Sequence, residues 1–302
     1  MDQCAEVEFS PSLTMRLTVA LSIIVGLAAL ALWSHGVVHS NASLFGINPL
    51  YAGSGLIVGL LVGLTGVGGG SLMTPLLVLL FGFHPGTAVG TDLLYASATK
   101  SVGTLVHSIN KSVDWRVTGL LALGSIPATT LTILVLYALH LQGNAASALI
   151  STVLGFALFL SAATLLFRRR LFELAARRSV EMSPRSTAIL TMLFGSVLGV
   201  LITLSSVGAG AIGVTVLILL YPRMPMAKIV GSDIAHAVPL TLLAGLGHLA
   251  LGSVNLPLLG SLLVGSIPGI IVGSQLAVRI SDQVLRPVLA GTLVLVGARL
   301  VL

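Results

Sequence analysis

The chain has 302 residues, of which 56% are hydrophobic and only 8% are charged, with a mean hydropathy of +1.08. Uncharged runs repeatedly exceed the roughly 18 to 20 residues that span a bilayer, so the composition predicts a multispanning membrane protein. The formal net charge of +6 does not indicate a nucleic-acid partner, because the basic residues lie between apolar runs and lack interleaved aromatic residues. The single cysteine, Cys4, excludes an intramolecular disulfide or a thiolate metal site within one chain.

The apolar runs predict helices, because they are unbroken and show none of the ten-residue alternation of a membrane β-barrel. The clear spans lie at 16–34, 87–109, 117–139, 146–167, 227–250, 257–278 and 284–302. We interpret 16–34 as a retained first span rather than a signal peptide, because acidic residues precede it and no convincing cleavage site follows it.

Two apolar segments, 50–82 and 187–220, are too long for one span. A single helix over either segment would measure about 50 Å, against about 30 Å of hydrocarbon. Each segment must therefore be broken.

The distribution of lysine and arginine indicates how the broken segments lie. Five groups of basic residues fall in or beside loops: Arg16, Lys111 and Arg116, the run 168–185, Arg223 and Lys228, and Arg279 and Arg286. Four connections have none: 35–49, 83–86, 140–145 and 251–256. The positive-inside rule is obeyed if both long segments enter and leave on one side, with the N-terminus and the 168–185 loop cytoplasmic. We therefore predict a re-entrant hairpin of two short helices in each segment.

The two halves of the chain are copies. A displacement of 140 residues aligns "GLIVGLLVGLTGVGGG" with "GSVLGVLITLSSVGAG", and a displacement of 141 aligns "VGTDLL" with "VGSDIA" and "GSIP" with "GSIP". One hairpin and three spanning helices per copy turn the second copy upside down. The expected division is an N-terminal helix and loop (1–49), a first repeat (50–167), a basic linker (168–185) and a second repeat (186–302). Inverted repeats with broken helices are typical of secondary transporters, although a duplication without functional consequence also occurs in channels.

Glycine-rich breaks at equivalent places are the expected substrate site. Glycine lets the backbone turn through positive φ and brings amide groups close to a ligand, and a half-helix that begins at a break points its positive end inward. Thr74 and Pro75 suit the start of such a half-helix. The alternative is close helix packing by small residues, which we prefer for Gly55, Gly59 and Gly63. The candidate substrate-binding residues of the two breaks are Thr65, Gly66, Gly68, Gly69, Gly70 and Ser71 in the first, and Ser205, Ser206, Gly208 and Gly210 in the second.

Charged residues inside the spans are the second group of candidates. Lys100 is the lysine or arginine that lies deep within a predicted span, since Arg16, Lys228, Arg286 and Arg299 lie near span ends, and a buried cation normally faces a cavity or an acidic partner. Asp92 and Asp233 occupy equivalent positions, where helix capping and a functional role are equally plausible. His236 and His107 are candidates for proton relay, although His107 also fits an interfacial position. No spacing indicates a metal site or a catalytic triad, so no cofactor is expected.

The ordered motifs "GLTGVGGGSLMTPLL", "AVGTDLLYASATKSVGTLVH" and "GSIPA" resemble the sulfite exporter TauE/SafE family over nearly all of residues 50–300. The resemblance implies a carrier of the bacterial inner membrane for small sulfur oxyanions or organosulfonates such as sulfite or sulfoacetate, driven by an ion gradient. Protons are the candidate coupling ion. Many relatives have serine in place of Asp92, which indicates a distinct subgroup.

Three functions follow from these patterns. The first is a secondary carrier that binds a small anion between the two breaks with Lys100 as counter-charge. The second is an anion channel of the same fold, and the third is a membrane partner or sensor subunit that transports nothing. An intramembrane enzyme is disfavoured, because no credible nucleophile or metal set is present. The direction of transport, the coupling ion and the oligomeric state do not follow from the sequence.

Overall fold

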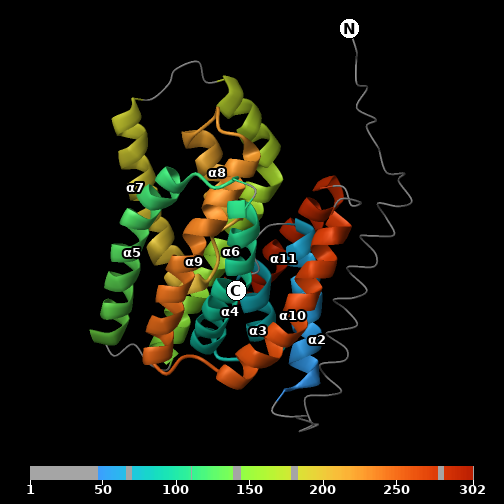
Figure 1. Cartoon of the computed structure of the whole chain (residues 1–302). Helices are drawn as coiled ribbons and strands as arrows, with labels where there is room; N and C mark the ends of the chain where they lie inside the picture. The colour runs from blue at the N-terminus through green and yellow to red at the C-terminus, as the bar shows by residue number, and fades with distance from the viewer. Residues whose placement is uncertain are drawn as a thin grey trace.

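The computed structural model of the protein describes residues 47–65, 70–109, 111–138, 144–177, 183–277 and 282–301. Within these ranges the chain forms helices and no β-strand, which confirms the predicted all-helical class (Figure 1). The predicted first span at 16–34 lies outside the described residues. The helices are α2 (Pro49–Thr65), α3 (Gly70–Leu79), α4 (Pro85–Ile109), α5 (Trp115–Ala138), α6 (Asn144–Arg177), α7 (Pro184–Ser205), α8 (Ala211–Leu220), α9 (Met226–Ala250), α10 (Leu256–Ala277) and α11 (Asp282–Val301).

Several helices have the length and composition of membrane spans. Five described segments qualify: Trp115–Ala138, Ala148–Phe167, Pro184–Ser205, Met226–Ala250 and Leu256–Gly273. Large apolar side chains such as Leu123, Leu131 and Phe156 are exposed on these helices, as expected of a surface that faces lipid. Helix α4 has 25 residues but is less apolar, because it carries Asp92, Lys100 and several hydroxyl groups. The protein is therefore a multi-pass membrane protein.

The two long apolar segments are each divided into a long and a short helix. In the second segment α7 has 22 residues and α8 has 10. In the first, α2 has 17 residues and α3 has 10. The expectation of two short helices was wrong for α7, which by itself is long enough to cross a bilayer. Its leucines and valines continue a regular helix until the Ser205-Ser206 pair and the glycines that follow it end the helix.

The two hairpins open at opposite ends of the molecule. One end, which we call the Ser253 end, holds the loop between α9 and α10 that contains Ser253. There the Asn48 amide donates to Ser261 Oγ over 3.1 Å, and the Asn255 amide donates to Thr91 Oγ1 over 3.0 Å. Helix α2 begins at this end, and α3 returns to it before α4 starts (Figure 1).

The other end, which we call the Asp114 end, holds the outer ends of the second hairpin. Residues from the start of α7 and the end of α8, including Thr187 and Leu220, line a common cavity there with Asp114. The α7–α8 hairpin therefore begins and ends at the Asp114 end, whereas α2–α3 opens at the Ser253 end.

Equivalent residues in the two halves make the same contacts. The Asp114 amide donates to Ser232 Oγ over 2.8 Å, and residues 141 positions away, Asn255 and Thr91, form the corresponding bond. Helix α2 packs against α10 just as α7 packs against α5. The glycine contacts repeat as well: Gly55 on Leu262 and Gly195 on Leu121, Gly59 on Ser266 and Gly199 on Ser125, and Gly265 on Ala52 and Gly124 on Met192.

These glycine contacts predict a large effect on stability. A Cβ added at Gly265 of α10 would overlap the carbonyl oxygen of Ala52 in α2, so Gly265→Ala must push the two helices apart. We expect Gly265→Ala to destabilise the protein by about 1 to 3 kcal/mol, measured as a lower midpoint of thermal unfolding in detergent.

The control for this prediction is Gly260→Ala on the same helix. Gly260 has open space around it, so alanine there should be neutral or should stabilise the helix by up to about 1 kcal/mol. Equal midpoints for the two variants would contradict the close α2–α10 packing.

The basic linker is partly helical. We expected the span to end at 167 and a loop to follow, but α6 continues to Arg177. The stretch "RRRLFELAAR" consists largely of alanine, leucine, arginine and glutamate, which are good helix formers, so the helix continues beyond the apolar span.

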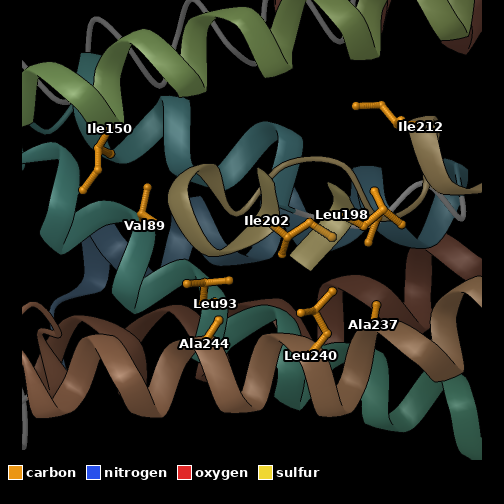
Figure 2. Packing of buried hydrophobic residues seen from close by; sticks show 10 residues of the cluster. Val89, Leu93, Ile150, Leu198, Ile202, Ile212, Ala237, Leu240 and Ala244 are labelled. Atoms are coloured by element: carbon orange, nitrogen blue, oxygen red, sulfur yellow. The ribbon is translucent and has the colours of Figure 1, made fainter. Parts of the chain in front are cut away.

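A buried apolar cluster holds the second break in place. It joins Val89 and Leu93 of α4, Leu198 and Ile202 of α7, and Leu240 of α9, together with residues of α6 and α8 (Figure 2). The cluster lies directly beside the polar side chains of α4 and α9, so the position of these side chains is fixed by dense packing.

Candidate functional site

The second break has a backbone that only particular residues can adopt. Ser206 ends α7 in the left-handed region with φ of 58°, and its amide donates to the Ile202 carbonyl over 2.7 Å. Gly208 and Gly210 follow with φ of 135° and 106°, values that favour glycine. The predicted glycine requirement is therefore met at these two positions.

The two serines of this break differ. Ser205 Oγ donates to the Leu201 carbonyl over 2.6 Å and accepts from the Val207 amide over 3.1 Å, so it closes the end of α7. Ser206 Oγ is buried and has no hydrogen-bond partner among the described residues. Of the two hydroxyl groups proposed for substrate, only that of Ser206 is available.

Only the two ends of the first break lie among the described residues. Gly66, Gly68 and Gly69 lie outside the described residues, and α3 begins at Gly70. Thr65 ends α2 and Ser71 lies in the first turn of α3. The candidate assignments of these six residues stay predictions.

The start of α3 differs from our expectation. Thr74 does not cap this helix but lies inside it, next to Pro75. Its hydroxyl donates instead to Asp92 Oδ2 of α4, and both side chains are fully buried. As a cap, Thr74 would accept from backbone amides, whereas here its hydroxyl donates to a buried carboxylate, which is an acceptor for a strong hydrogen bond.

Asp92 lies where the first hairpin and the second break meet. It is the eighth residue of α4 and is 0% exposed, so it is not a cap at the helix start. Its Oδ1 has no hydrogen-bond partner among the described residues, and the Ser206 hydroxyl lies near the carboxylate without an ordinary hydrogen bond. The capping alternative is therefore wrong for Asp92.

Asp233 faces the start of α8. It is the eighth residue of α9 and is 1% exposed, which also excludes a capping role. Neither carboxylate oxygen has a hydrogen-bond partner among the described residues, although the Gly210 amide faces the group. A Cβ added at Gly213 would overlap Asp233 Oδ1, so the carboxylate fills the space that the glycine leaves empty.

Lys100 lies within electrostatic range of both carboxylates. Its side chain is 9% exposed, and it interacts electrostatically with Asp233 and, more weakly, with Asp92. Asp92, Lys100 and Asp233 are the buried side chains of the described residues that carry a formal charge. The structure thus brings together the three charges that the sequence singled out.

The two candidate histidines have different surroundings. His236 is fully buried, its Nε2 lies 2.8 Å from Ser125 Oγ of α5, and it is within electrostatic range of Lys100. His107 is near the end of α4, where its Nδ1 lies 3.0 Å from Ser112 Oγ in the following loop. The structure therefore joins His236 to the central charges and leaves His107 at the Asp114 end.

A cavity of about 580 Å³ lies at the Asp114 end, away from the central charges. Its lining includes Arg116, Arg223 and Lys228 beside apolar residues of α5, α7 and α8. A positively charged cavity therefore lies at the outer ends of the helices that flank the second break.

The family model for the sulfite exporter TauE/SafE matches residues 51–300. The chain belongs to the sulfite exporter TauE/SafE family. The resemblance inferred from the sequence motifs is confirmed.

Several relatives of this TauE/SafE protein are described as membrane transporters. The probable membrane transporter protein YjnA of Bacillus subtilis is 40% identical over 248 residues, which cover 82% of this chain and 97% of the relative. The probable membrane transporter protein YdhB of the same organism is 29% identical over 250 residues, covering 79% and 96%. A probable membrane transporter protein of Xylella fastidiosa is 28% identical over 235 residues, covering 76% and 84%. No solved structure matches the chain.

Membership of the TauE/SafE family identifies the protein as a membrane transporter and not an enzyme. The partners of the central charges were not found from the sequence. Thr74 was interpreted as a cap, and Gly213 and Ser125 carried no signal apart from their small size. Each acquires its role through a contact with another helix, so only the packing reveals it.

Proposed function

We propose that this TauE/SafE protein is a secondary transporter of small anions, namely sulfur oxyanions or organosulfonates such as sulfite, sulfoacetate or thiosulfate. The observation that carries the proposal is the burial of Lys100 in a protein with few charges, together with its electrostatic interaction with Asp233, which packs against the start of α8. A buried cation and a helix N-terminus both favour an anion, and in hydrocarbon neither is retained without a partner.

The proposed mechanism is alternating access between two inverted repeats, 50–167 and 186–302, on either side of the linker at 168–185. The recurring contacts at positions 140 and 141 apart support the repeat, and the opposite openings of the two hairpins support the inversion. The short helix α8 would begin within the membrane and point its positive end at the substrate.

The proposed orientation places the Asp114 end in the cytoplasm of a bacterial inner membrane. Lys111, Arg116, Arg223 and Lys228 lie in or near the loops at this end, whereas the loop at 251–255 has no basic residue. This distribution obeys the positive-inside rule. The positive cavity at this end would also attract anions from the cytoplasm.

The test is uptake of labelled sulfite into proteoliposomes, with and without a pH gradient, with sulfoacetate and thiosulfate as competitors. We expect saturable uptake that the competitors inhibit and that shows counterflow. Flux that rises linearly with concentration would instead identify an anion channel. Absence of flux for all three anions, from protein shown to be folded, would refute the anion assignment.

A further inference from the structure

We propose that the carboxylate of Asp233 occupies the anion site of the empty transporter, so that a transported anion binds only when Asp233 takes up a proton and leaves that site. This inference rests on the proposed function and adds how substrate and proton are coupled.

Asp233 lies where an anion is favoured. Helix α8 has 10 residues, and its first amides follow Gly210, which faces the carboxylate. The positive end of a helix attracts an anion, and Lys100 strengthens the attraction from α4. Because Gly213 has no side chain, the carboxylate fits closely against the first turn of α8. The Asp233 carboxylate, an anionic group, therefore already occupies the start of α8.

The carboxylate is held by charge and not by completed hydrogen bonds. Both oxygens of Asp233 are buried without a hydrogen-bond partner among the described residues, whereas Asp92 accepts from Thr74. A buried carboxylate without partners is costly, so little is lost when it moves away in the neutral form. A sulfur oxyanion such as sulfite has more acceptor oxygens than a carboxylate, and it would meet the Lys100 ammonium, the first amides of α8 and the Ser206 hydroxyl, which lies near Asp92.

The charges of the centre couple this exchange to a proton. Two carboxylates already share one ammonium, and an added anion would give Lys100 three negative partners in a medium of low dielectric. A proton that enters from the same side of the membrane as the anion would neutralise Asp233. Lys100 could then pair with the substrate. By linkage, a bound anion then raises the affinity for that proton equally, so both move together and are released together.

The other titratable groups around the centre do not replace Asp233 in this role. Helix α8 carries no titratable side chain, and those of α5 and α7 lie near the helix ends. On α4, Asp92 is bonded to Thr74, and Tyr95 is buried near Asp92. On α9, His236 is engaged with Ser125. Asp233 is the acidic group that lies at the start of α8.

The experiment compares wild type with Asp233→Asn in proteoliposomes and measures two kinds of labelled-sulfite transport. The first is equilibrium exchange, and the second is accumulation driven by a pH gradient. The variant keeps the shape of the side chain and leaves Asp92 and Lys100 as a balanced pair. We expect Asp233→Asn to retain exchange, to lose accumulation driven by the pH gradient, and to lower the half-saturating sulfite concentration about tenfold, because no carboxylate competes with the anion. Thr241→Ala on the same helix is the control and should behave as wild type, because the Thr241 hydroxyl bonds within α9, to the carbonyls of Ala237 and Val238.

The outcomes separate the two proposals. Absence of sulfite, sulfoacetate and thiosulfate flux in wild type would refute both the transport function and this inference. Wild-type transport together with an Asp233→Asn variant that still accumulates sulfite under a pH gradient would refute only the inference.

A second measurement needs no variant. Wild-type protein in weakly buffered detergent solution should take up protons when sulfite binds, after correction for the titration of sulfite in a protein-free sample. Binding without proton uptake would overturn the inference, including where Asp233→Asn fails to fold.

Discussion

Replacing Lys100 with alanine is expected to abolish saturable sulfite transport. Lys100 is the buried cation of the centre, and it interacts with both Asp92 and Asp233. Removing one partner of a buried charge pair typically costs about 2 to 5 kcal/mol, which corresponds to a loss in anion affinity of roughly 30-fold or more. The measurement is initial sulfite uptake into proteoliposomes at matched amounts of folded protein.

Two further variants distinguish loss of binding from loss of folding. Lys100→Ala leaves two buried carboxylates without a cation, so the double variant Lys100→Ala with Asp233→Asn should recover folded yield but not transport. Thr241→Ala is the matched control, because Thr241 is the residue equivalent to Lys100 and its hydroxyl bonds within its own helix, to the carbonyls of Ala237 and Val238. Normal sulfite transport by Lys100→Ala would remove Lys100 from the binding site.

Much of the architecture could be predicted from length, hydropathy and internal identity. A run such as 117–139 contains enough apolar residues to define a span, and the helix is found at Trp115–Ala138. The need for a break in 187–220 followed from length alone, because the segment exceeds the thickness of the bilayer. These properties are sums over many residues, so errors at single positions have little effect on them.

The surroundings of single residues could not be predicted in the same way. Asp92 and Asp233 lie early in their helices, and sequence position alone left open whether they were caps at a surface. Their burial depends on how α4 and α9 pack on each other and on the second break, as the cluster in Figure 2 illustrates. Hydropathy reports the composition of a helix but not which neighbour covers each face.

The two halves share a backbone plan but not their charges. Contacts such as Asp114 to Ser232 and Asn255 to Thr91 recur between the halves, whereas Lys100 has only Thr241 as its counterpart. The carboxylates also differ, since Asp92 accepts from Thr74 while Asp233 faces the start of α8. The recurring backbone contacts are thus symmetric between the halves, whereas the charged side chains of the centre are not.

Replacing Gly210 with alanine is expected to reduce transport about tenfold or more while the protein remains folded. Gly210 has φ of 106° and ψ of −74°, a conformation that costs a residue with a side chain about 1 to 3 kcal/mol. The strain would turn the first amides of α8 away from Lys100 and Asp233, and a shift of this energy changes the occupied conformation about five- to 150-fold. Sulfite exchange and thermal unfolding, measured on the same preparation, separate the local effect from a general loss of stability.

The control for this prediction is a glycine with positive φ in a loop outside the second break. Gly252 lies in the loop after α9 with φ of 71° and has open space around it, so Gly252→Ala should cost stability without affecting transport. If Gly210→Ala and Gly252→Ala lowered transport equally, backbone strain in general would explain the loss. If only Gly210→Ala impaired transport, anion binding would depend on the glycine conformation at the start of α8. This is the role predicted for the second break.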